Sequence, residues 1–300
     1  LGERIEQAQA KIYALAGREF TINSPKQLAV ILFEERGLTP IKKTKTGFST
    51  DAKTLEQLSY IDPLPAEILQ YRTLAKLKST YVDTLPGTVS DISGRIHTSF
   101  HQAVTATGRL SSNSPNLQNI PIRSDDGRRI RGCFVPDPGY VFLSCDYSQV
   151  ELRVLAHYCE DGPLVEAFQT GQDIHSRTAS EIFGTPLDAV TSDTRSAAKA
   201  INFGIVYGMS AFRLANDLRI TRKEASAYLE NYFARYPQVK RVQESLIAAA
   251  RDKGYSETLW GRKRPIGDIN ASNARERAAA ERIALNSPIQ GTAADLIKLA

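Results

Sequence analysis

The chain has 300 residues, of which 42% are hydrophobic, 38 are Lys or Arg and 33 are Asp or Glu. This composition is ordinary for a globular chain with a sizeable core, and it excludes collagen-like and low-complexity proteins. The three cysteines, Cys133, Cys145 and Cys159, are odd in number and lack metal-binding spacing, which argues against a disulfide framework and for a reducing compartment. No apolar run reaches the length of a membrane span and the first residues do not form a signal peptide, so we expect a cytoplasmic protein that binds no membrane.

Positive charge is concentrated in the last third of the sequence. Residues 195–300 contain 18 Lys or Arg and 10 Asp or Glu, whereas residues 1–194 contain 20 and 23. A basic region of this kind suggests a polyanionic partner such as nucleic acid or nucleotide, although a solvated basic surface would give the same count. The sequence begins and stops inside helical patterns, without an initial Met or a final stop signal, so we expect an internal piece of a longer protein.

Helical patterns dominate the first 90 residues. Apolar side chains recur at helical spacing over residues 3–16, up to Gly17. Ser24 and Pro25 are typical of a helix start, and this second helix is expected to run to Gly37. A further helix fits residues 65–82. We therefore predict a small helical unit that ends near residue 88.

Strand signals follow. Residues 94–104 alternate between apolar and polar, and residues 133–135 and 140–145 are predicted to form two strands joined by a Pro-Asp-Pro-Gly turn. After Asp146 the pattern becomes helical and stays mainly helical to Ala300. One hairpin, at residues 255–265, is expected to interrupt it.

Asp146 is expected where a buried strand gives way to a helix. A carboxylate fixed there by rigid backbone suits a hard cation such as Mg²⁺, which takes few protein oxygens and keeps water or phosphate oxygens as its other ligands. Aspartate is also a frequent helix cap. One carboxylate leaves both interpretations open.

Four residues recur at every fourth position and would form one stripe on a helix: Arg195, Lys199, Phe203 and Tyr207. Ser192 or Asp193 can cap the start of this helix. Two cations near a helix N-terminus interact unfavourably with the helix dipole, so helix stability does not explain them. A polyphosphate bound alongside the helix would explain both cations. The alternative is an amphipathic helix with packed aromatics and solvated charges, in which Arg195 forms a salt bridge with Asp193 or Glu181.

These segments resemble, in family order, the motifs of the family A DNA polymerases. Asp146-Tyr-Ser-Gln-Val-Glu-Leu-Arg153 is similar to the first motif, and the stripe together with Gly204 and Gly208 is similar to the second. Further matches are the segments 107–112, 115–121, 173–175 and 286–295. The resemblance is to bacterial members and covers the chain from about residue 10 to its end.

The resemblance implies an α+β right-hand polymerase fold, with a helical thumb, an antiparallel palm sheet that carries Asp146, and helical fingers. On this basis we expect the thumb at residues 1–89, the first part of the palm at 90–159, the fingers at 160–268 and the returning palm helix at 269–300. The family's third motif supplies a second metal-binding aspartate. We expect that motif beyond Ala300, so the fragment would hold half of the metal site, would be incomplete at its C-terminus, and would be weak or inactive.

The function implied is template-directed addition of deoxynucleoside triphosphates to a primer 3′-hydroxyl by two-metal phosphoryl transfer, in DNA replication and repair. The resemblance implies two Mg²⁺ ions, primer–template DNA and deoxynucleoside triphosphates as partners, and a monomer. The catalytic residues implied are Asp146, Lys199 and Arg195, with Asp146 and the carbonyl of Tyr147 as metal ligands. The nucleotide-binding residues implied are Tyr147, Gln149, Glu151, His175, Arg195, Lys199, Phe203 and Tyr207. The DNA-binding residues implied are Arg72, Lys76, Arg109, Asn116, Gln118, Asn119, Arg282, Asn286 and Gln290.

Three other functions stay open at this point. The chain could be a non-catalytic module that binds primer–template DNA or nucleotide, because one metal carboxylate is missing. It could belong to a single-subunit RNA polymerase, although Glu151 and the Tyr-Ser-Gln run favour DNA synthesis. A structural helical protein with a basic face would leave the ordered motifs unexplained.

Overall fold

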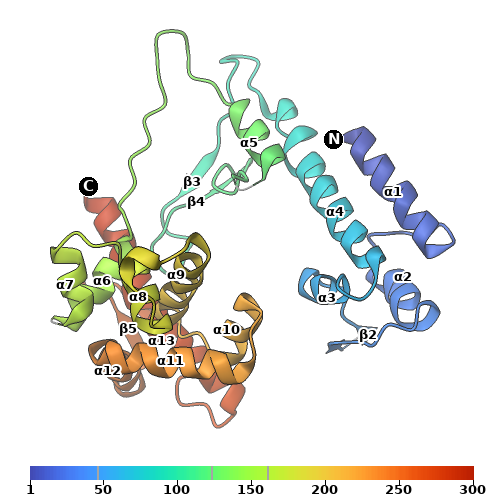
Figure 1. Cartoon of the computed structure of the whole chain (residues 1–300). Helices are drawn as coiled ribbons and strands as arrows, with labels where there is room; N and C mark the ends of the chain where they lie inside the picture. The colour runs from blue at the N-terminus through green and yellow to red at the C-terminus, as the bar shows by residue number, and fades with distance from the viewer. Residues whose placement is uncertain (46, 123, 161) are drawn as a thin grey trace. The chain divides into compact units, whose positions relative to one another are not determined.

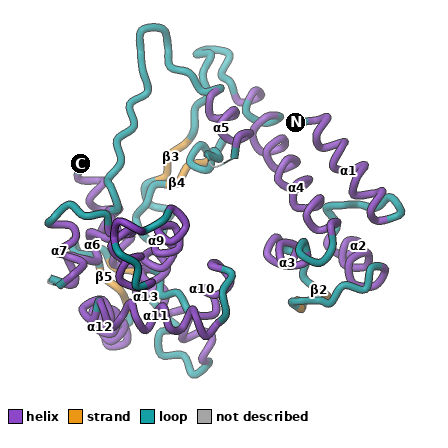
Figure 2. The backbone as a smooth tube through the Cα atoms, viewed as in Figure 1, coloured by secondary structure: helices purple, strands orange, loops and turns teal. Residues whose placement is uncertain are grey.

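The computed structural model describes residues 1–45, 47–122, 124–160 and 162–300. Helices dominate, and the strands are few and short (Figures 1 and 2). The chain divides into two compact units, unit 1 (Leu1–Phe100 and Ser112–Phe142) and unit 2 (His101–Ser111 and Leu143–Ala300). Within the described ranges, no helix combines the length and the apolar character that crossing a membrane requires.

Unit 1 is built from short helices and one small hairpin. Its elements are α1 (Gly2–Ala16), α2 (Pro25–Ala29), the π-helix η1 (Val30–Glu35), β1 (Lys43–Thr44), β2 (Gly47–Phe48), α3 (Ala52–Leu58), α4 (Pro63–Leu77), the π-helix η2 (Lys78–Val82), the 3-10 helix η3 (Pro86–Thr88) and α5 (Asp125–Gly132). Strands β3 (Ser99–His101) and β4 (Ser111–Asn113) pair with each other where the chain passes between the units.

Helices α2, α3, α4 and α5 of unit 1 begin where the sequence supplies side-chain caps. Ser24 accepts a hydrogen bond from the amide of Gln27, and Asp51 accepts one from the amide of Thr54 at 2.9 Å. Such caps satisfy amides that a helix leaves without a partner. Ile12 of α1 and Ile68 of α4 are fully buried in one core. The three helices predicted for this region are confirmed, with the second and third each ending in a π-helical turn.

The strand predictions were mostly wrong. Of residues 94–104 only Ser99–His101 is a strand, and residues 133–135 and 140–145 form none. Cys133 instead ends helix α5, which the sequence reading did not anticipate. The predicted turn is present, since the amide of Tyr140 donates to the carbonyl of Asp137 at 3.0 Å.

The physical reason lies in the pairing that a strand needs. A single extended segment cannot form a strand unless a neighbouring backbone supplies hydrogen bonds. Within the described part of the chain, no strand pairs with residues 140–145, and Val141 and Leu143 are 86% and 87% exposed. Asp146 therefore follows an exposed extended segment and not a buried strand.

Unit 2 contains the remaining helices and a hairpin. Its elements are α6 (Val150–Cys159), α7 (Pro163–Gln169), α8 (Ile174–Phe183), the 3-10 helix η4 (Leu187–Ala189), α9 (Ser192–Val206), α10 (Ala211–Leu218), α11 (Arg222–Arg235), α12 (Pro237–Lys253), β5 (Tyr255–Glu257), β6 (Lys263–Pro265) and α13 (Ala274–Leu299). Strands β5 and β6 pair antiparallel, with Tyr255 opposite Pro265, which confirms the predicted hairpin.

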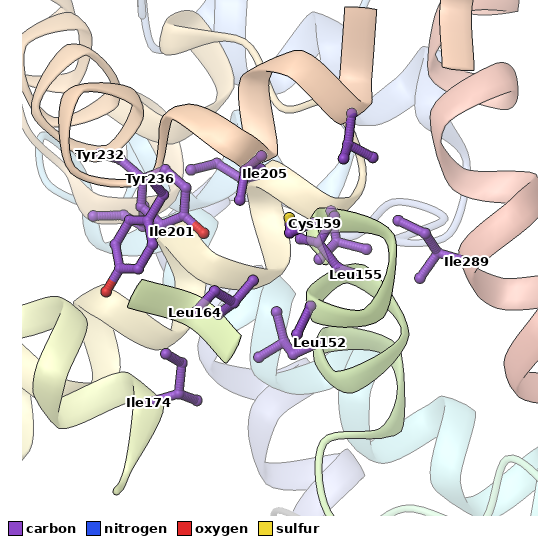
Figure 3. Packing of buried hydrophobic residues seen from close by; sticks show 14 of the residues in the cluster. Leu152, Leu155, Cys159, Leu164, Ile174, Ile201, Ile205, Tyr232, Tyr236 and Ile289 are labelled. Atoms are coloured by element: carbon purple, nitrogen blue, oxygen red, sulfur yellow. The ribbon is translucent and has the colours of Figure 1, made fainter. Parts of the chain in front are cut away.

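One apolar core holds most of unit 2 together (Figure 3). Leu152 of α6, Leu164 of α7, Ile174 of α8 and Ile201 of α9 point into it, and each is 2% exposed or less. Burying a side chain of this size contributes about 1.5–3 kcal/mol. Helices α6, α8 and α9, which carry predicted site residues, are therefore fixed to one another by a shared core.

Candidate functional site

The predicted stripe lies on α9, and its cap is one residue earlier than expected. The hydroxyl of Thr191 accepts from the amide of Thr194 at 3.2 Å, and the hydroxyl of Thr194 accepts from the amide of Thr191 at 3.0 Å. This reciprocal pair satisfies two amides at once, which neither Ser192 nor Asp193 does from inside the first turn. The helix continues through Lys199 and Phe203 and ends at Val206, so the stripe is confirmed as helical for its first three residues, and Tyr207 follows as the C-cap.

Arg195 is held by an acid that the sequence reading did not single out. Its Nη2 lies 2.6 Å from Oδ2 of Asp173 and its Nε lies 3.2 Å from the same oxygen. Asp173 also caps α8 by accepting from the amide of Ser176 at 2.8 Å. Burial works to raise the pKa of Asp173, but the hydrogen bonds from Arg195 and from the Ser176 amide outweigh it and lower the pKa.

The two other acids considered for Arg195 are not its partners. Asp193 forms no ion pair with the described residues, and Glu181 pairs with Arg177 and Arg235 instead. Lys199, one turn after Arg195, is exposed and forms no ion pair within the described part of the chain. One cation of the stripe is thus tied to a carboxylate and the other is open to a ligand.

His175 lies beside the stripe in a buried position. It is 2% exposed, and its ring centroid is 5.8 Å from that of Phe203. Its Nδ1 lies 3.1 Å from the side-chain nitrogen of Asn202, which is fully buried. Burial lowers the pKa of His175, the positive charges of Arg195 and Lys199 lower it further, and the nearby Asp173 opposes this.

Glu151 joins three predicted site residues. Its buried carboxylate accepts hydrogen bonds from Nη2 of Arg109 and from the hydroxyl of Tyr207. Burial raises the pKa of Tyr207, the bond to Glu151 raises it further, and a hydrogen bond with Gln290 counteracts them. Residues from the segment 101–111, from α6, from the end of α9 and from α13 therefore meet at one point.

A cavity of about 740 Å³ opens next to this point, between the end of α9 and helix α13. Its lining includes Tyr207, Arg282, Asn286 and Gln290, together with further basic side chains. Oδ1 of Asn286 is buried and has no hydrogen-bond partner among the described residues. A buried acceptor without a partner is costly, so it is a good candidate to receive a donor from a ligand.

The start of the first motif, unlike Glu151 farther along it, forms no hydrogen bond or ion pair with the other predicted site residues that the structure describes. Asp146 and Tyr147 are exposed, and Asp146 forms no hydrogen bond or ion pair within the described residues. Gln149 precedes α6 in a left-handed conformation with φ of 55°. Nowhere in the described ranges do three or more His, Cys, Asp or Glu gather as a metal site would require. One carboxylate does not by itself form a site for a cation.

The remaining DNA-binding predictions fall in unit 1. Nη1 of Arg72 donates to the carbonyl of Thr50 at 2.6 Å, and burial lowers the pKa of Arg72, whereas Lys76 on the same helix is exposed. The carbonyl of Asn119 accepts from the hydroxyl of Tyr81. Oδ1 of Asn116 accepts from the amide of Gln118 at 3.0 Å. The segment 116–119 is thus held both by a hydrogen bond within it and by one from Tyr81.

Sequence reasoning missed the side chains that support the predicted ones. Asp173 carried a signal, because an acid followed three residues later by a serine and by an apolar run is typical of a helix start. Asn202 carried a weaker one, a polar residue at helical spacing from the apolar Ala198, Ile205 and Val206. Asp295 and Arg262 form a third supporting pair, with Nε of Arg262 2.8 Å from Oδ1 of Asp295.

Comparison with known proteins agrees with this geometry. The sequence matches the family model described as DNA polymerase family A over residues 1–300. It is 52% identical to a DNA polymerase I of Pseudomonas aeruginosa, covering 100% of this chain and 33% of that protein, and 52% identical to a DNA polymerase I of Geobacillus stearothermophilus, covering 100% and 34%. The chain therefore spans about a third of the length of the curated relatives it matches.

A solved structure gives the same result for the fold. It is described as the POL domain of Pol1 from M. smegmatis in complex with DNA primer-template and dNTP. The match covers 99% of this chain and 53% of the M. smegmatis chain. The TM-score is 0.93 and the sequence identity is 44%. The helices and short strands of this α+β chain are thus arranged as in a polymerase domain, and the chain belongs to DNA polymerase family A.

Proposed function

We propose that the longer protein carrying this sequence is a template-directed DNA polymerase that extends a primer 3′-hydroxyl, as a monomer in the bacterial cytoplasm, in replication and repair. The observation that supports it most is the packing of α8 against α9, which places His175 beside Phe203 and ties Arg195 to the start of α8, with Lys199 exposed one turn after Arg195. The Pol1 structure from M. smegmatis, with its DNA primer-template and dNTP, supports the same substrates.

The nucleotide would lie along α9. Arg195 offers a forked donor and Lys199 a compact charge to the triphosphate oxygens, and His175 offers a further donor. Phe203 would pack against the sugar. Glu151 and Tyr207, which are hydrogen-bonded to each other, would close the space beneath the second carbon of the sugar and so exclude a ribose hydroxyl.

The primer–template end would lie over the cavity between α9 and α13. Arg109, Arg282, Asn286 and Gln290 would reach its minor groove, where correct base pairs present similarly placed acceptors. Because all correct base pairs present these acceptors, contacts to them test the shape of the new base pair and not its sequence. Contacts farther along the duplex would come from Arg72, Lys76, Asn116, Gln118 and Asn119.

The division into named parts belongs to the same proposal. We assign residues 1–89 to a thumb, 90–159 to the first part of a palm, 160–268 to fingers and 269–300 to a returning palm helix. Closure of the fingers would bring Arg195 and Lys199 onto the triphosphate only when the new base pair fits, which is selection by induced fit.

Mg²⁺ is the metal that this reaction would use in the complete protein, where it would stabilise charge on the phosphate oxygens. Asp146 and the carbonyl of Tyr147 offer the hard oxygen ligands that Mg²⁺ prefers. They are too few to form its site, since no group of three potential metal ligands gathers among the described residues.

The chemistry that this chain's residues would perform is electrostatic. The primer hydroxyl attacks the α-phosphate and pyrophosphate leaves. Lys199 would stabilise the negative charge that develops on the leaving pyrophosphate and can deliver a proton to it. Because Lys199 forms no ion pair within the described residues, its charge is available for this role.

Primer extension by the longer protein, with Mg²⁺ and the four deoxynucleoside triphosphates, tests the proposal. Extension directed by the template supports it, and the isolated chain is expected to be weak or inactive in the same assay. Tight binding of primer–template DNA without any extension by the longer protein would favour the non-catalytic binding module. Preferred use of ribonucleoside triphosphates would favour an RNA polymerase.

A further inference from the structure

A row of buried polar side chains crosses the core of unit 2 and ends at His175. The hydroxyl of Tyr236 lies 2.5 Å from Oε2 of Glu181 and 3.5 Å from the hydroxyl of Thr178. The side-chain nitrogen of Asn202 lies 3.0 Å from the hydroxyl of Thr178 and 3.1 Å from Nδ1 of His175. Thr178 and Asn202 are 0% exposed and Tyr236 is 1% exposed, so these groups must satisfy one another.

The far end of the row fixes the direction of its hydrogen bonds. Glu181 lies 3.1 Å from Nε of Arg177 and 3.0 Å from Nη2 of Arg235, and its carboxylate forms an ion pair with both. An ionised carboxylate only accepts hydrogen bonds, so Tyr236 must donate to it. Burial raises the pKa of Tyr236 and the bond to Glu181 raises it further, so the phenol keeps its proton.

The direction then passes from residue to residue. Because Tyr236 has given its only hydrogen to Glu181, its oxygen can only accept. The hydroxyl of Thr178 lies 3.5 Å from that oxygen and 3.3 Å from Oδ1 of Asn202, so these two acceptors share its one hydrogen. The oxygen of Thr178 in turn accepts from the side-chain nitrogen of Asn202. That nitrogen carries a second hydrogen, which faces Nδ1 of His175, so Nδ1 is an acceptor and carries no proton.

The surroundings of the ring are consistent with a neutral His175. Burial lowers its pKa, and the charges of Arg195 and Lys199 on α9 lower it further, while Asp173 at the start of α8 works in the opposite direction. Arg235, at the end of α11, pairs with Glu181 of α8. With Nδ1 unprotonated and the ring neutral, the single ring proton must lie on Nε2.

We propose that Asn202, oriented by the hydrogen bonds that start at Glu181, holds His175 in the tautomer whose proton lies on Nε2, so that Nε2 presents an N–H to a nucleotide phosphate. Nε2 forms no hydrogen bond with the described residues, which leaves it for a ligand. The identification of the ligand as a nucleotide phosphate rests on the proposed function. The tautomer does not, because it follows from contacts within the chain.

The opposite arrangement makes a different prediction. If the amide of Asn202 were turned over, its oxygen would accept from an N–H on Nδ1, and Nε2 would carry a lone pair. A lone pair would repel a phosphate oxygen. Asn202 is therefore a positioning residue, and the two arrangements differ in an observable, the nitrogen of His175 that carries the proton.

The experiment is nuclear magnetic resonance of the chain with ¹⁵N only in its histidines. Because the chain has four histidines, His175→Gln identifies the signals of His175 by their loss. At neutral pH we expect Nε2 to be protonated and Nδ1 unprotonated. A proton on Nδ1, or on both nitrogens, would overturn the proposal.

Two variants test whether the buried row sets this tautomer. Tyr236→Phe removes one of the two acceptors that share the hydroxyl hydrogen of Thr178, and we expect the tautomer ratio to shift about fivefold toward Nδ1–H, the effect of one lost hydrogen bond. Tyr228→Phe is the matched control, because Tyr228 of α11 packs edge-on against Phe183 of α8 and is not in the row. Asn202→Asp places a carboxylate against Nδ1 and should protonate it. An unchanged ratio in both Tyr236→Phe and Asn202→Asp would show that the row does not act on His175.

A binding measurement on the longer protein tests the donor itself. His175→Ala should weaken binding of a deoxynucleoside triphosphate about tenfold or more, as expected for a lost hydrogen bond to a charged group. His175→Gln keeps an N–H at similar reach and should retain most of the affinity. Equal losses in the two variants would contradict an Nε2–H donor. An Nε2–H signal in a protein that does not extend primers would leave the tautomer standing and remove the proposed function alone.

Discussion

Asp173 and Arg195 connect the first turns of α8 and α9 through a single carboxylate. One oxygen of Asp173 accepts from the amide of Ser176 and the other accepts from Arg195 at 2.6 Å. The same acid therefore fixes where α8 begins and occupies the guanidinium that we propose for the triphosphate. Both side chains are 41% exposed, so an anionic ligand can compete for Arg195.

Asp173→Asn should tighten binding of a deoxynucleoside triphosphate to the longer protein. Asparagine is as good a helix cap as aspartate, so α8 keeps its start, while Arg195 no longer has to leave a charged partner. An exposed ion pair of this kind contributes about 0.2–1 kcal/mol, which corresponds to about a one-and-a-half- to fivefold gain in affinity. Asp193→Asn removes the same charge from the first turn of α9 without touching Arg195, and it should leave affinity unchanged. Weaker binding by Asp173→Asn would mean that Asp173 orients Arg195 for the nucleotide.

Glu151→Ala should raise incorporation of ribonucleotides by the longer protein. The substitution opens the space that Glu151 and Tyr207 close, and it leaves Arg109 and Tyr207 without their shared acceptor. The unfolding free energy of the chain should fall by about 1–3 kcal/mol for the lost hydrogen bonds. Glu151→Gln, which keeps the size of the side chain, should discriminate better than Glu151→Ala. If the ratio of ribonucleotide to deoxyribonucleotide incorporation is the same in Glu151→Ala and wild type, Glu151 is not the filter.

Gly108→Ala should destabilise the chain more than Gly171→Ala. Both glycines have a positive φ, 79° and 67°, so each substitution carries the same backbone strain. A Cβ at Gly108 would lie 2.7 Å from Cζ of Arg262, whereas none of the other atoms lies within 4 Å of one at Gly171. Arg262 cannot move away cheaply, because it is bound to the buried Asp295. Urea unfolding measures the difference, and equal losses in the two variants would mean that Arg262 is free to shift.

The contribution of Asp51 to stability should depend on pH. The hydrogen bond from the amide of Thr54 lowers the pKa of Asp51 most, burial opposes it, and the Lys42 ammonium lowers it further. A carboxyl with a lowered pKa stabilises the folded state fully above its unfolded pKa of about 4, and this stability is lost progressively as the pH falls below that value.

Asp51→Asn keeps the cap but cannot titrate, so its stability should differ from wild type by about 0.2–1 kcal/mol near pH 7. The difference should shrink as the pH is lowered toward 2. Asp91→Asn, at an exposed position without an ion pair among the described residues, is the control for the loss of one charge. Urea unfolding across this pH range would contradict the assignment if the difference between wild type and Asp51→Asn stayed constant.

Local chemistry made much of the chain predictable. The spacing of Arg195, Lys199 and Phe203 required a helix, and the structure has one. Ser24 followed by Pro25 marked a helix start correctly, because capping depends only on residues within one turn. The hairpin at residues 255–265 was predictable for the same reason, since its turn signals lie beside its strands.

Contacts between residues that are far apart in the sequence were not predictable in this way. The run from Tyr140 to Cys145 has the composition of a strand, but a strand exists only when another backbone pairs with it, and residue type alone cannot supply that. The acid that binds Arg195 lies 22 residues away, so the local candidates Asp193 and Glu181 were wrong. Asn202 was missed because its role depends on His175 and Thr178, which only the packing of α8 against α9 brings to it.

Equilibrium binding of a deoxynucleoside triphosphate to the longer protein, with primer–template DNA bound, tests the nucleotide site on α8 and α9 most directly. Lys199→Ala should weaken this binding about tenfold, as expected for the loss of a charge-assisted contact to phosphate. Lys240→Ala, at an exposed position on α12, should leave it unchanged. Equal affinities of wild type, Lys199→Ala and Lys240→Ala would contradict a triphosphate held along α9.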